Sequence, residues 1–166
     1  VSACPNHQTG RTTPLWTRAV VAMSGTFGYE LDLNRLSPEE AGEVKDQIAA
    51  FQRDYDLIQN GSYYRLTDPT VETRYAAWQT VLPEESLVSL VVTHPEANAR
   101  PLHLWLRGLD PDARYRLDRM EIHGCAQAVT APTGGVYSGS TLLYAGLTLP
   151  QLTGDYPCVQ IHLTRL

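Results

Sequence analysis

A change of architecture is predicted at residues 22–32, which read Ala22-Met23-Ser24-Gly25-Thr26-Phe27-Gly28-Tyr29-Glu30-Leu31-Asp32. A helical pattern ends here. Glycine can adopt backbone angles that other residues resist, so Gly25 and Gly28 allow the chain to turn. Phe27, Tyr29 and Leu31 add apolar side chains to the same segment. We therefore expect it to be buried between two packed units, rather than to form a solvated linker or a loop that grips a ligand.

Two helices are predicted around this stretch. The first begins at Thr13-Pro14, with Thr13 as its cap, and its apolar stripe is formed by Trp16, Ala19, Val20 and Met23. The second begins with a capping box between Ser37 and Glu40, with Pro38 at the first helical position. It extends to residue 60, and its apolar stripe is formed by Ala41, Val44, Ile48, Phe51, Tyr55 and Ile58.

From residue 62 the apolar period changes from helical to alternating. Turn signals separate six predicted strands, at residues 63–66, 75–82, 87–93, 102–109, 115–122 and 157–166. Two segments differ: residues 140–149 predict a short helical turn capped by Ser140, and residues 124–135 predict an exposed hairpin loop. The fold class is therefore mainly β, an antiparallel β-sandwich of Greek-key type preceded by two helices.

Composition excludes several classes of function. The 166 residues are 43% apolar and 19% charged, as in a globular domain. The net charge of -5 and the lack of a Lys/Arg stripe argue against nucleic-acid binding. No apolar run is long enough to predict a membrane span. Three widely spaced cysteines indicate neither a disulfide framework nor a zinc site, so we expect reduced thiols, a cytoplasmic location, and neither metal nor cofactor.

Several motifs occur in order along the chain. They include PNHQTGR at residues 5–11, LSPEE at 36–40, GSYYRL at 61–66 and LRGLDPDARY at 106–115. With residues 22–32, 77–79, 137–139 and 145–147, they resemble the C-terminal part of glycoside hydrolase family 36 α-galactosidases over nearly the whole chain. The chain departs from the family pattern in a longer loop at 122–135, and at Ser140-Thr141, where acidic residues are common.

The resemblance implies a fragment of a larger enzyme. Family members have an N-terminal β-sandwich, a catalytic (β/α)8 barrel and a C-terminal antiparallel β domain, and they remove terminal α-galactosyl groups from raffinose-type sugars with retention. Residues 1–60 would be the end of the last barrel strand and the closing barrel helices, and residues 61–166 the C-terminal sandwich. The implied partners are the rest of the α-galactosidase chain and, through it, α-galactoside sugars. The implied parent is a homo-oligomer, for which a tetramer is one expected form.

The catalytic aspartates of the family would lie upstream of residue 1, so we expect this chain to be inactive alone. Retaining hydrolysis needs two carboxyl groups about 5 Å apart. The close acidic pairs here are predicted to be solvated helix-face or turn residues, namely Asp54/Asp56, Glu84/Glu85 and Asp110/Asp112. Barrel active sites lie at the C-terminal ends of the strands. The resemblance therefore implies that the wall of the substrate pocket includes Ser2, Cys4, Asn6 and His7. None of these residues is expected to be catalytic.

Two alternatives remain open. The sandwich could be an autonomous carbohydrate-binding module, because aromatic faces stack on sugar rings; its candidate residues are Tyr63, Tyr64, Trp78 and Trp105. Alternatively, Cys4 and His7 could form an activated thiol, although three residues of separation do not establish contact. If residues 13–60 are barrel helices, their apolar stripes would be exposed in the isolated chain, which predicts self-association or partial disorder there.

Overall fold

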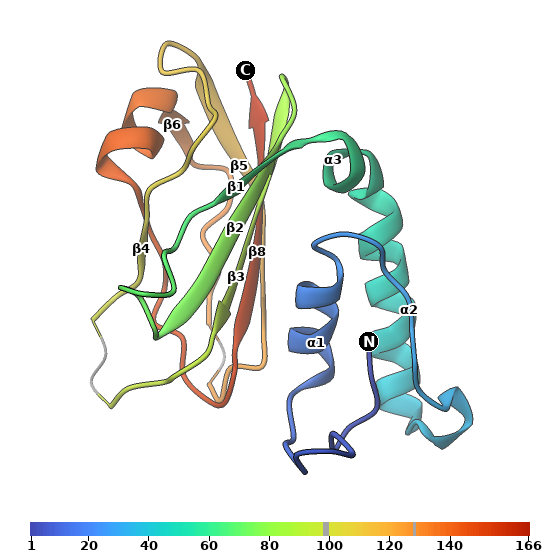
Figure 1. Ribbon diagram of the computed structural model, residues 1–166. Helices are drawn as coiled ribbons and strands as arrows, with labels where there is room; N and C mark the ends of the chain where they lie inside the picture. Colours follow the sequence, from blue (N-terminus) through green and yellow to red (C-terminus); the bar gives the residue numbers. More distant parts are fainter. Residues whose placement is uncertain (98–99, 128) are drawn as a thin grey trace.

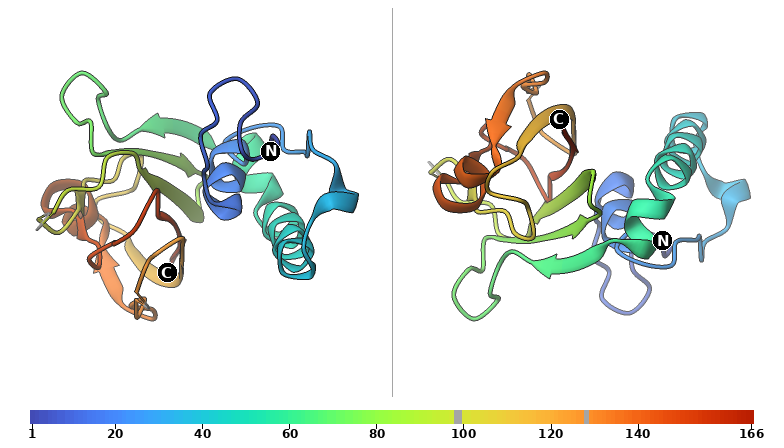
Figure 2. Two further views of the ribbon diagram at one scale, coloured as in Figure 1. Left: turned by 90° about the horizontal axis from the view of Figure 1, so that it is seen from below. Right: turned by 90° about the horizontal axis from the view of Figure 1, so that it is seen from above.

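The computed structural model describes residues 1–97, 100–127 and 129–166. A six-stranded antiparallel sheet separates a helical layer from a thinner layer of short strands and a π-helix, as Figures 1 and 2 show. The elements, in chain order, are α1 (Leu15–Ala22), η1 (Leu33–Arg35), α2 (Pro38–Arg53), α3 (Tyr55–Asn60), β1 (Ser62–Arg65), β2 (Tyr75–Val81), β3 (Glu85–Val92), β4 (His103–Leu104), β5 (Arg114–His123), β6 (Val136–Ser138), η2 (Thr141–Ala145), β7 (Leu147–Thr148) and β8 (Cys158–Arg165). The predicted fold class, mainly antiparallel β preceded by helices, is confirmed.

The large sheet has the strand order β1-β2-β3-β8-β5-β6. The last strand, β8, lies between β3 and β5, so the C-terminal segment pairs in the middle of the sheet rather than at an edge (Figure 1). On one face, Leu90, Leu117 and Ile161 pack against the second layer, where β4 pairs with β7 and contributes Leu104. This face encloses the main core of the molecule.

The helical layer covers the opposite face of the same sheet. Ala19 of α1, Met23 just after α1 and Ala50 of α2 form a smaller core with Leu87 of β3. Residues 86–92 of β3 are all buried, because β3 is covered on both faces. α2 begins with the predicted capping box, in which the backbone N–H of Glu40 donates to the Ser37 hydroxyl at 3.2 Å and the Ser37 N–H donates to the Glu40 carboxylate at 2.9 Å.

The segment at 22–32 differs from its prediction. Neither Gly25 nor Gly28 adopts a left-handed backbone angle, and a β-carbon would meet nothing within 4 Å at either position. Met23 is buried, but Phe27 and Tyr29 are only half-buried, so the segment is not enclosed within this chain. Phe27 packs against Phe51 of α2, with ring centroids 5.0 Å apart, and the Tyr29 hydroxyl donates to the Gln47 side chain at 2.8 Å, so α2 covers one side of the segment.

The start of α1 is also corrected. Thr13 does not cap it: the helix begins at Leu15, Pro14 occupies the cap position, and no side chain accepts a hydrogen bond from the first turn. Only the backbone of Thr13 has a role, because its carbonyl accepts from the Arg18 guanidinium. The Thr13-Pro14 pair therefore predicted where the helix begins, but it did not predict a side chain that caps the helix.

The second helix is interrupted. It breaks at Asp54, which separates α2 from α3, and the prediction that Asp54 lies on a solvated face is wrong. The Asp54 side chain is 5% exposed, and both carboxylate oxygens accept from Arg119 of β5, at 2.7 and 2.8 Å. A buried carboxylate needs such a partner, so the ion pair fixes the break against the sheet.

Three further segments refine the strand prediction. The strand expected at 102–109 is reduced to β4, because Gly108 turns the chain with a φ of +68° beside the Tyr64 ring. The segment at 140–149 forms the π-helix η2 and then the strand β7, and its cap is the Ser138 hydroxyl rather than Ser140. The loop at 124–135 does connect the hairpin of β5 and β6, although residue 128 lies outside the described residues.

Candidate functional site

The predicted pocket-wall residues lie in a loop between the N-terminal segment and α1. Ser2 forms a parallel bridge with Glu30, and the Glu30 N–H donates to the Val1 carbonyl at 2.9 Å. The chain then leaves this bridge, passes through residues 3–12 and returns to α1 at Thr13. The loop is therefore anchored at its start by the segment that follows α1.

Asn6 organises the interior of this loop. Its side-chain oxygen accepts from the backbone N–H groups of Gln8 and Thr9, at 3.1 and 3.0 Å. Its own N–H donates to the Arg11 carbonyl at 2.9 Å, and its carbonyl accepts from the N–H of Gly10 at 2.8 Å. The Asn6 side-chain oxygen is thus committed to the loop, which gives the residue a shaping role.

Cys4 and His7 do not form a catalytic pair. The half-buried Cys4 thiol donates to the Thr13 carbonyl at 3.6 Å, whereas His7 is exposed. A thiol needs an adjacent base to act as a nucleophile. Within the described residues no imidazole bonds to Cys4. Cys158 offers no alternative, because burial raises the pKa of its thiol to about 12.

Arg18 closes the loop. Its Nε donates to the Thr13 carbonyl at 3.1 Å, and its Nη1 donates to the Ser2 carbonyl. An open hollow of about 350 Å³ lies beside it and is lined by Ser2, Ala3, Cys4, Asn6, Gln8, Thr9, Arg11, Thr13 and Arg18. The structure thus brings three of the predicted wall residues to one hollow but leaves His7 out of its lining. Arg18 was not predicted to belong to the site, because it occupies an ordinary polar position of a helix.

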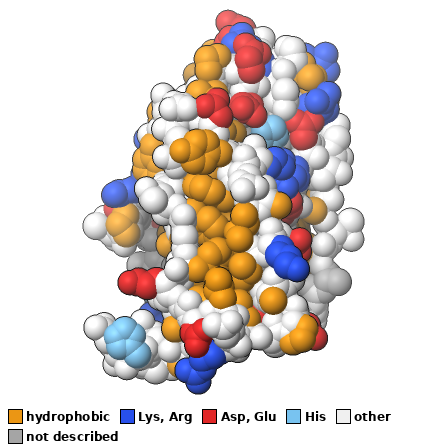
Figure 3. All heavy atoms as spheres, turned by 90° about the vertical axis from the view of Figure 1, so that its right-hand side faces the viewer, with side chains coloured by type: hydrophobic (Ala, Val, Ile, Leu, Met, Phe, Trp, Pro, Cys, Tyr) orange, Lys and Arg blue, Asp and Glu red, His pale blue; other side chains and the backbone are white. Residues whose placement is uncertain are grey.

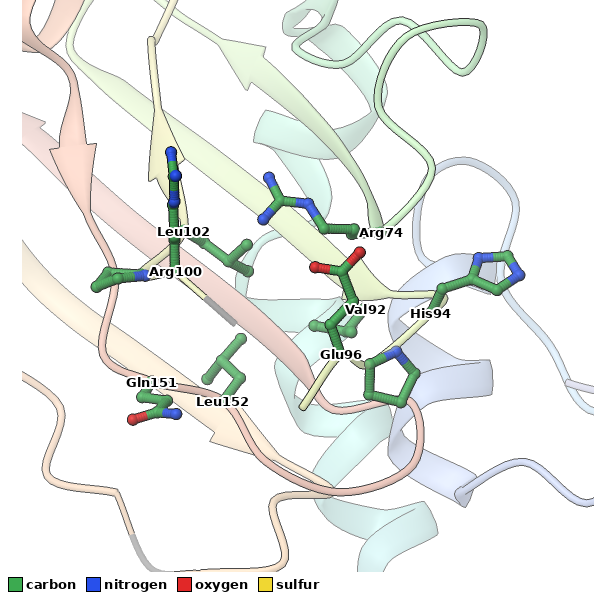
Figure 4. Close-up of a pocket in the computed structure, with 10 residues that line it drawn as sticks. Arg74, Val92, His94, Glu96, Arg100, Leu102, Gln151 and Leu152 are labelled. Carbon is green, nitrogen blue, oxygen red and sulfur yellow. The ribbon is translucent and has the colours of Figure 1, made fainter. Parts of the chain in front are cut away.

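A second hollow lies at the end of β3, beside the loop that follows this strand (Figure 4). It is lined by Arg74, Leu102 and Leu152 among others, and its cavity volume is about 30 Å³. His94 lies at its rim and points away from the two leucines. Ligand sites for drug-sized molecules measure hundreds of cubic ångströms. This cavity has room for about one water molecule and excludes a sugar ring.

The carboxylates of Asp54 and Glu121 are engaged in a structural network. Asp54 and Glu121 share two arginines: Arg53 pairs with them at 3.1 and 2.9 Å, and Arg119 at 2.7 and 3.4 Å. A retaining glycosidase needs one carboxylate free to attack and one carboxyl group free to donate a proton. This network joins the helices to β5 and leaves neither group free for those roles.

The other acidic pairs have similarly structural contacts. Asp110 accepts from the N–H of Asp112 at 3.0 Å and pairs with Arg165 at 2.6 Å. Glu85 contacts His162 of β8 at 2.9 Å. One carboxylate of each pair, that of Asp110 and that of Glu85, is therefore held by turn or strand contacts.

The four aromatic residues considered for sugar stacking are spread over the molecule. Tyr63 on β1 and Trp105 just beyond β4 are more than half exposed, whereas Tyr64 and Trp78 are half-buried. β1 is an edge of the large sheet and β4 belongs to the second layer, so the two exposed rings are not part of one platform. Trp105 has one aromatic neighbour, His103, with ring centroids 4.9 Å apart.

Across residues 1–97, 100–127 and 129–166 there is no group of three or more His, Cys, Asp or Glu side chains arranged to hold a metal ion. In the same ranges no helix has the length and apolar character required to cross a membrane.

Comparisons with known proteins cover the whole chain. The family profile described as "Glycosyl hydrolase family 36 C-terminal domain" matches residues 75–163, and the profile "Melibiase" matches residues 1–61. The bifunctional α-galactosidase/sucrose kinase AgaSK of Mediterraneibacter gnavus is 42% identical over 168 residues, which is 100% of this chain and 16% of AgaSK. The α-galactosidase AgaA of Geobacillus stearothermophilus is 40% identical, over 94% of this chain and 20% of AgaA.

Solved structures give the same result. The galactosidase domain of AgaSK superposes with a TM-score of 0.88, covering 100% of this chain and 21% of that domain. A variant of G. stearothermophilus AgaA in complex with raffinose has a TM-score of 0.84 and 40% identity, again over 100% of this chain and 21% of the other. The chain therefore spans about a fifth of the length of the relatives that it matches.

Proposed function

Because this chain belongs to glycosyl hydrolase family 36, we propose that it is the C-terminal structural portion of an α-galactosidase that hydrolyses terminal α-galactosyl groups of raffinose-type oligosaccharides with retention. The observation that carries the proposal is the end-to-end match to α-galactosidase structures of which this chain is only about a fifth. On this proposal the chain has no catalytic activity of its own. The arginine-bound carboxylates of Asp54 and Glu121 support that view.

We assign the two parts of the chain different roles. Residues 61–166 form the C-terminal sandwich, and residues 1–60 are the end of the catalytic barrel with its closing helices. The enclosed core of the sandwich and the one-sided core of the helical layer support this division. The loop with Ser2, Cys4 and Asn6 would form part of the wall of the galactoside pocket, and His7 would lie beyond the hollow.

The outer face of the helical layer is proposed to pack against the rest of the α-galactosidase chain. Figure 3 shows an apolar area on this side of the molecule, with charged residues at its margins. In the helices of this layer, Val21, Ile48 and Tyr55 are 50%, 38% and 54% exposed. Removing such a surface from water is favourable. In the isolated chain the same surface predicts self-association, which light scattering over a range of concentrations would measure.

The compartment and assembly of the parent enzyme are part of the same proposal. The free thiols of Cys4, Cys125 and Cys158 fit a reducing, cytoplasmic environment. We expect the parent to be a homo-oligomer, with a tetramer as one form, and sedimentation of the full-length protein measures this directly.

The test of the proposed function is galactose release from raffinose by the full-length protein that contains this segment. Retention is read from the anomer that forms first, by nuclear magnetic resonance during the first minutes of hydrolysis. Release of α-galactose first is the expected result. Inability of the folded full-length protein to cleave raffinose or an aryl α-galactoside would overturn the proposal.

One observation favours a second candidate, autonomous sugar binding by the sandwich. Trp105 is 55% exposed, and exposed aromatic rings offer a face on which a sugar ring can stack. Saturable, galactose-specific changes in tryptophan fluorescence that disappear in Trp105→Ala would support this candidate. Identical titrations with galactose and glucose would exclude it.

A further inference from the structure

The first turn of α1 connects the sandwich to the loop that lines the hollow. Trp16 stacks on His123 of β5, with ring centroids 3.8 Å apart and planes 4° from parallel. The Thr17 hydroxyl donates to the Tyr156 carbonyl at 2.5 Å, and Thr17 is 2% exposed. The next residue, Arg18, faces the loop instead. Consecutive residues of one helical turn therefore contact two different parts of the molecule.

Arg18 holds both ends of the loop with one guanidinium group. It donates to the Ser2 carbonyl at the start of the loop and to the Thr13 carbonyl at its end. The Thr13 carbonyl also accepts from the Cys4 thiol, so three positions of the loop meet at this point. Hydrogen bonds from a charged donor are stronger than neutral ones, and only arginine presents several donors in a rigid planar fork.

The contacts around Asn6 shape the tip of the loop but do not join its ends. The guanidinium therefore determines how the tip is placed relative to α1. Since Trp16 and Thr17 fix α1 on the sandwich, the placement of the loop depends on the sandwich as well.

We propose that Arg18 is a positioning residue for the galactoside pocket of the parent enzyme: it holds the wall loop in register with α1, and the sandwich acts on the pocket through this helix. This inference rests on the proposed function, since it assigns a role within that same pocket. Arg18 need not contact the sugar, because it acts through the backbone carbonyls of Ser2 and Thr13.

The experiment uses the full-length α-galactosidase with Arg18→Lys and Arg18→Ala, and measures kcat and KM for raffinose separately. Lysine keeps the charge but cannot hold both carbonyls with a planar fork, so we expect KM to rise about tenfold in Arg18→Lys, as for the loss of one charge-assisted hydrogen bond. The kcat per folded molecule should change less. In Arg18→Ala, millimolar guanidinium should lower KM toward the wild-type value. The matched control is Arg35→Gln, which changes an exposed arginine of the same layer and should leave both constants unchanged.

A second variant tests the connection to the sandwich. Thr17→Val keeps the shape of the side chain but removes the hydrogen bond to Tyr156, and a KM rise of a few fold is expected. A wild-type KM in Arg18→Lys and Arg18→Ala would overturn the inference. So would a fall in kcat and melting temperature at constant KM, because that pattern reflects a merely structural role. Failure of the wild-type enzyme to cleave raffinose would instead refute the proposed function.

Discussion

The sandwich and the helical layer use the same sheet in different ways. On the sandwich side, Leu90, Leu117 and Ile161 are enclosed by a second layer that the chain itself supplies. On the helical side, α1 covers the middle of the sheet, but the outer faces of the helices keep exposed apolar groups such as Ile48 and Tyr55. One region has a complete core, and the other has a core on one face only. The proposed division of the chain into a C-terminal sandwich and a piece of the catalytic barrel predicts this difference.

The largest expected effect comes from the same substitution in both regions. Ile161→Ala removes a side chain that is 1% exposed, whereas Ile48→Ala removes one that is 38% exposed. We expect Ile161→Ala to lower the free energy of unfolding by about 3–4 kcal/mol and Ile48→Ala by less than about 1 kcal/mol. Urea denaturation of the 166-residue chain measures both values.

The same two substitutions, Ile161→Ala and Ile48→Ala, can also be compared in the full-length protein. If the rest of the chain covers α2, the cost of Ile48→Ala should rise there toward that of a buried isoleucine. An unchanged small cost in the full-length protein would contradict the idea that this face is an internal contact.

The next effect concerns the connection between the two regions. Asp54→Asn removes the charge that both arginines pair with, and we expect a loss of about 3 kcal/mol, because Arg119 is left without its buried partner. Asp56→Asn, at an exposed position two residues away, should cost less than about 0.5 kcal/mol. Equal losses in the two variants would show that the Asp54 network does not join the layers.

A smaller effect on stability is expected at the two positions that the sequence predicted to be helix caps, Ser37 and Thr13. Ser37→Ala removes the capping box of α2 and should cost about 1 kcal/mol. Thr13→Ala leaves the backbone carbonyl in place and should cost less than about 0.5 kcal/mol. Thermal unfolding followed by circular dichroism compares them, and a larger loss in Thr13→Ala would restore its predicted role as a cap.

The smallest effect is a pH dependence at the contact between α1 and β5. Burial lowers the pKa of His123 below its ordinary value of about 6.5, against the opposing influence of Glu121 and Asp46. The unfolded chain therefore takes up a proton that the folded chain resists, so this contribution to stability is present above pH 6.5 and is lost as the pH falls below it. His123→Phe should keep the stack on Trp16 and weaken the loss of stability between pH 7 and 5. An identical pH profile in the variant would contradict this.

Much of the fold followed from local patterns. The capping box at Ser37 and the strands β1, β2, β3, β5 and β8 depend on neighbouring residues, and the bounds of these strands were predicted to within two residues. The strand predicted at 102–109 is the exception, because only β4 forms there. The break at Asp54 could not be predicted, because it depends on Arg119, which is 65 residues away in sequence. The short strands β6 and β7 were missed for a related reason, since they form by pairing with β5 and β4 rather than by their own periodicity.

The candidate site was predictable only in part. The resemblance to the family predicted a pocket wall formed by Ser2, Cys4, Asn6 and His7. The structure gathers the first three around one hollow and leaves His7 out of its lining. Arg18 was not predicted, because its contacts are to backbone carbonyls, which carry no sequence signal. Gly25 and Gly28 illustrate the opposite case: a pattern suggested unusual backbone angles that the structure does not contain.

The most direct test of the central claim compares hydrolysis of an aryl α-galactoside by the purified 166-residue chain and by the full-length protein under identical conditions. If this chain is a structural portion of the enzyme, the full-length protein should hydrolyse the substrate and the 166-residue chain alone should not. Turnover by the chain that persists through repeated purification would show that a catalytic pair of carboxyl groups lies within residues 1–166, and it would refute the assignment of this chain as a structural portion of the enzyme.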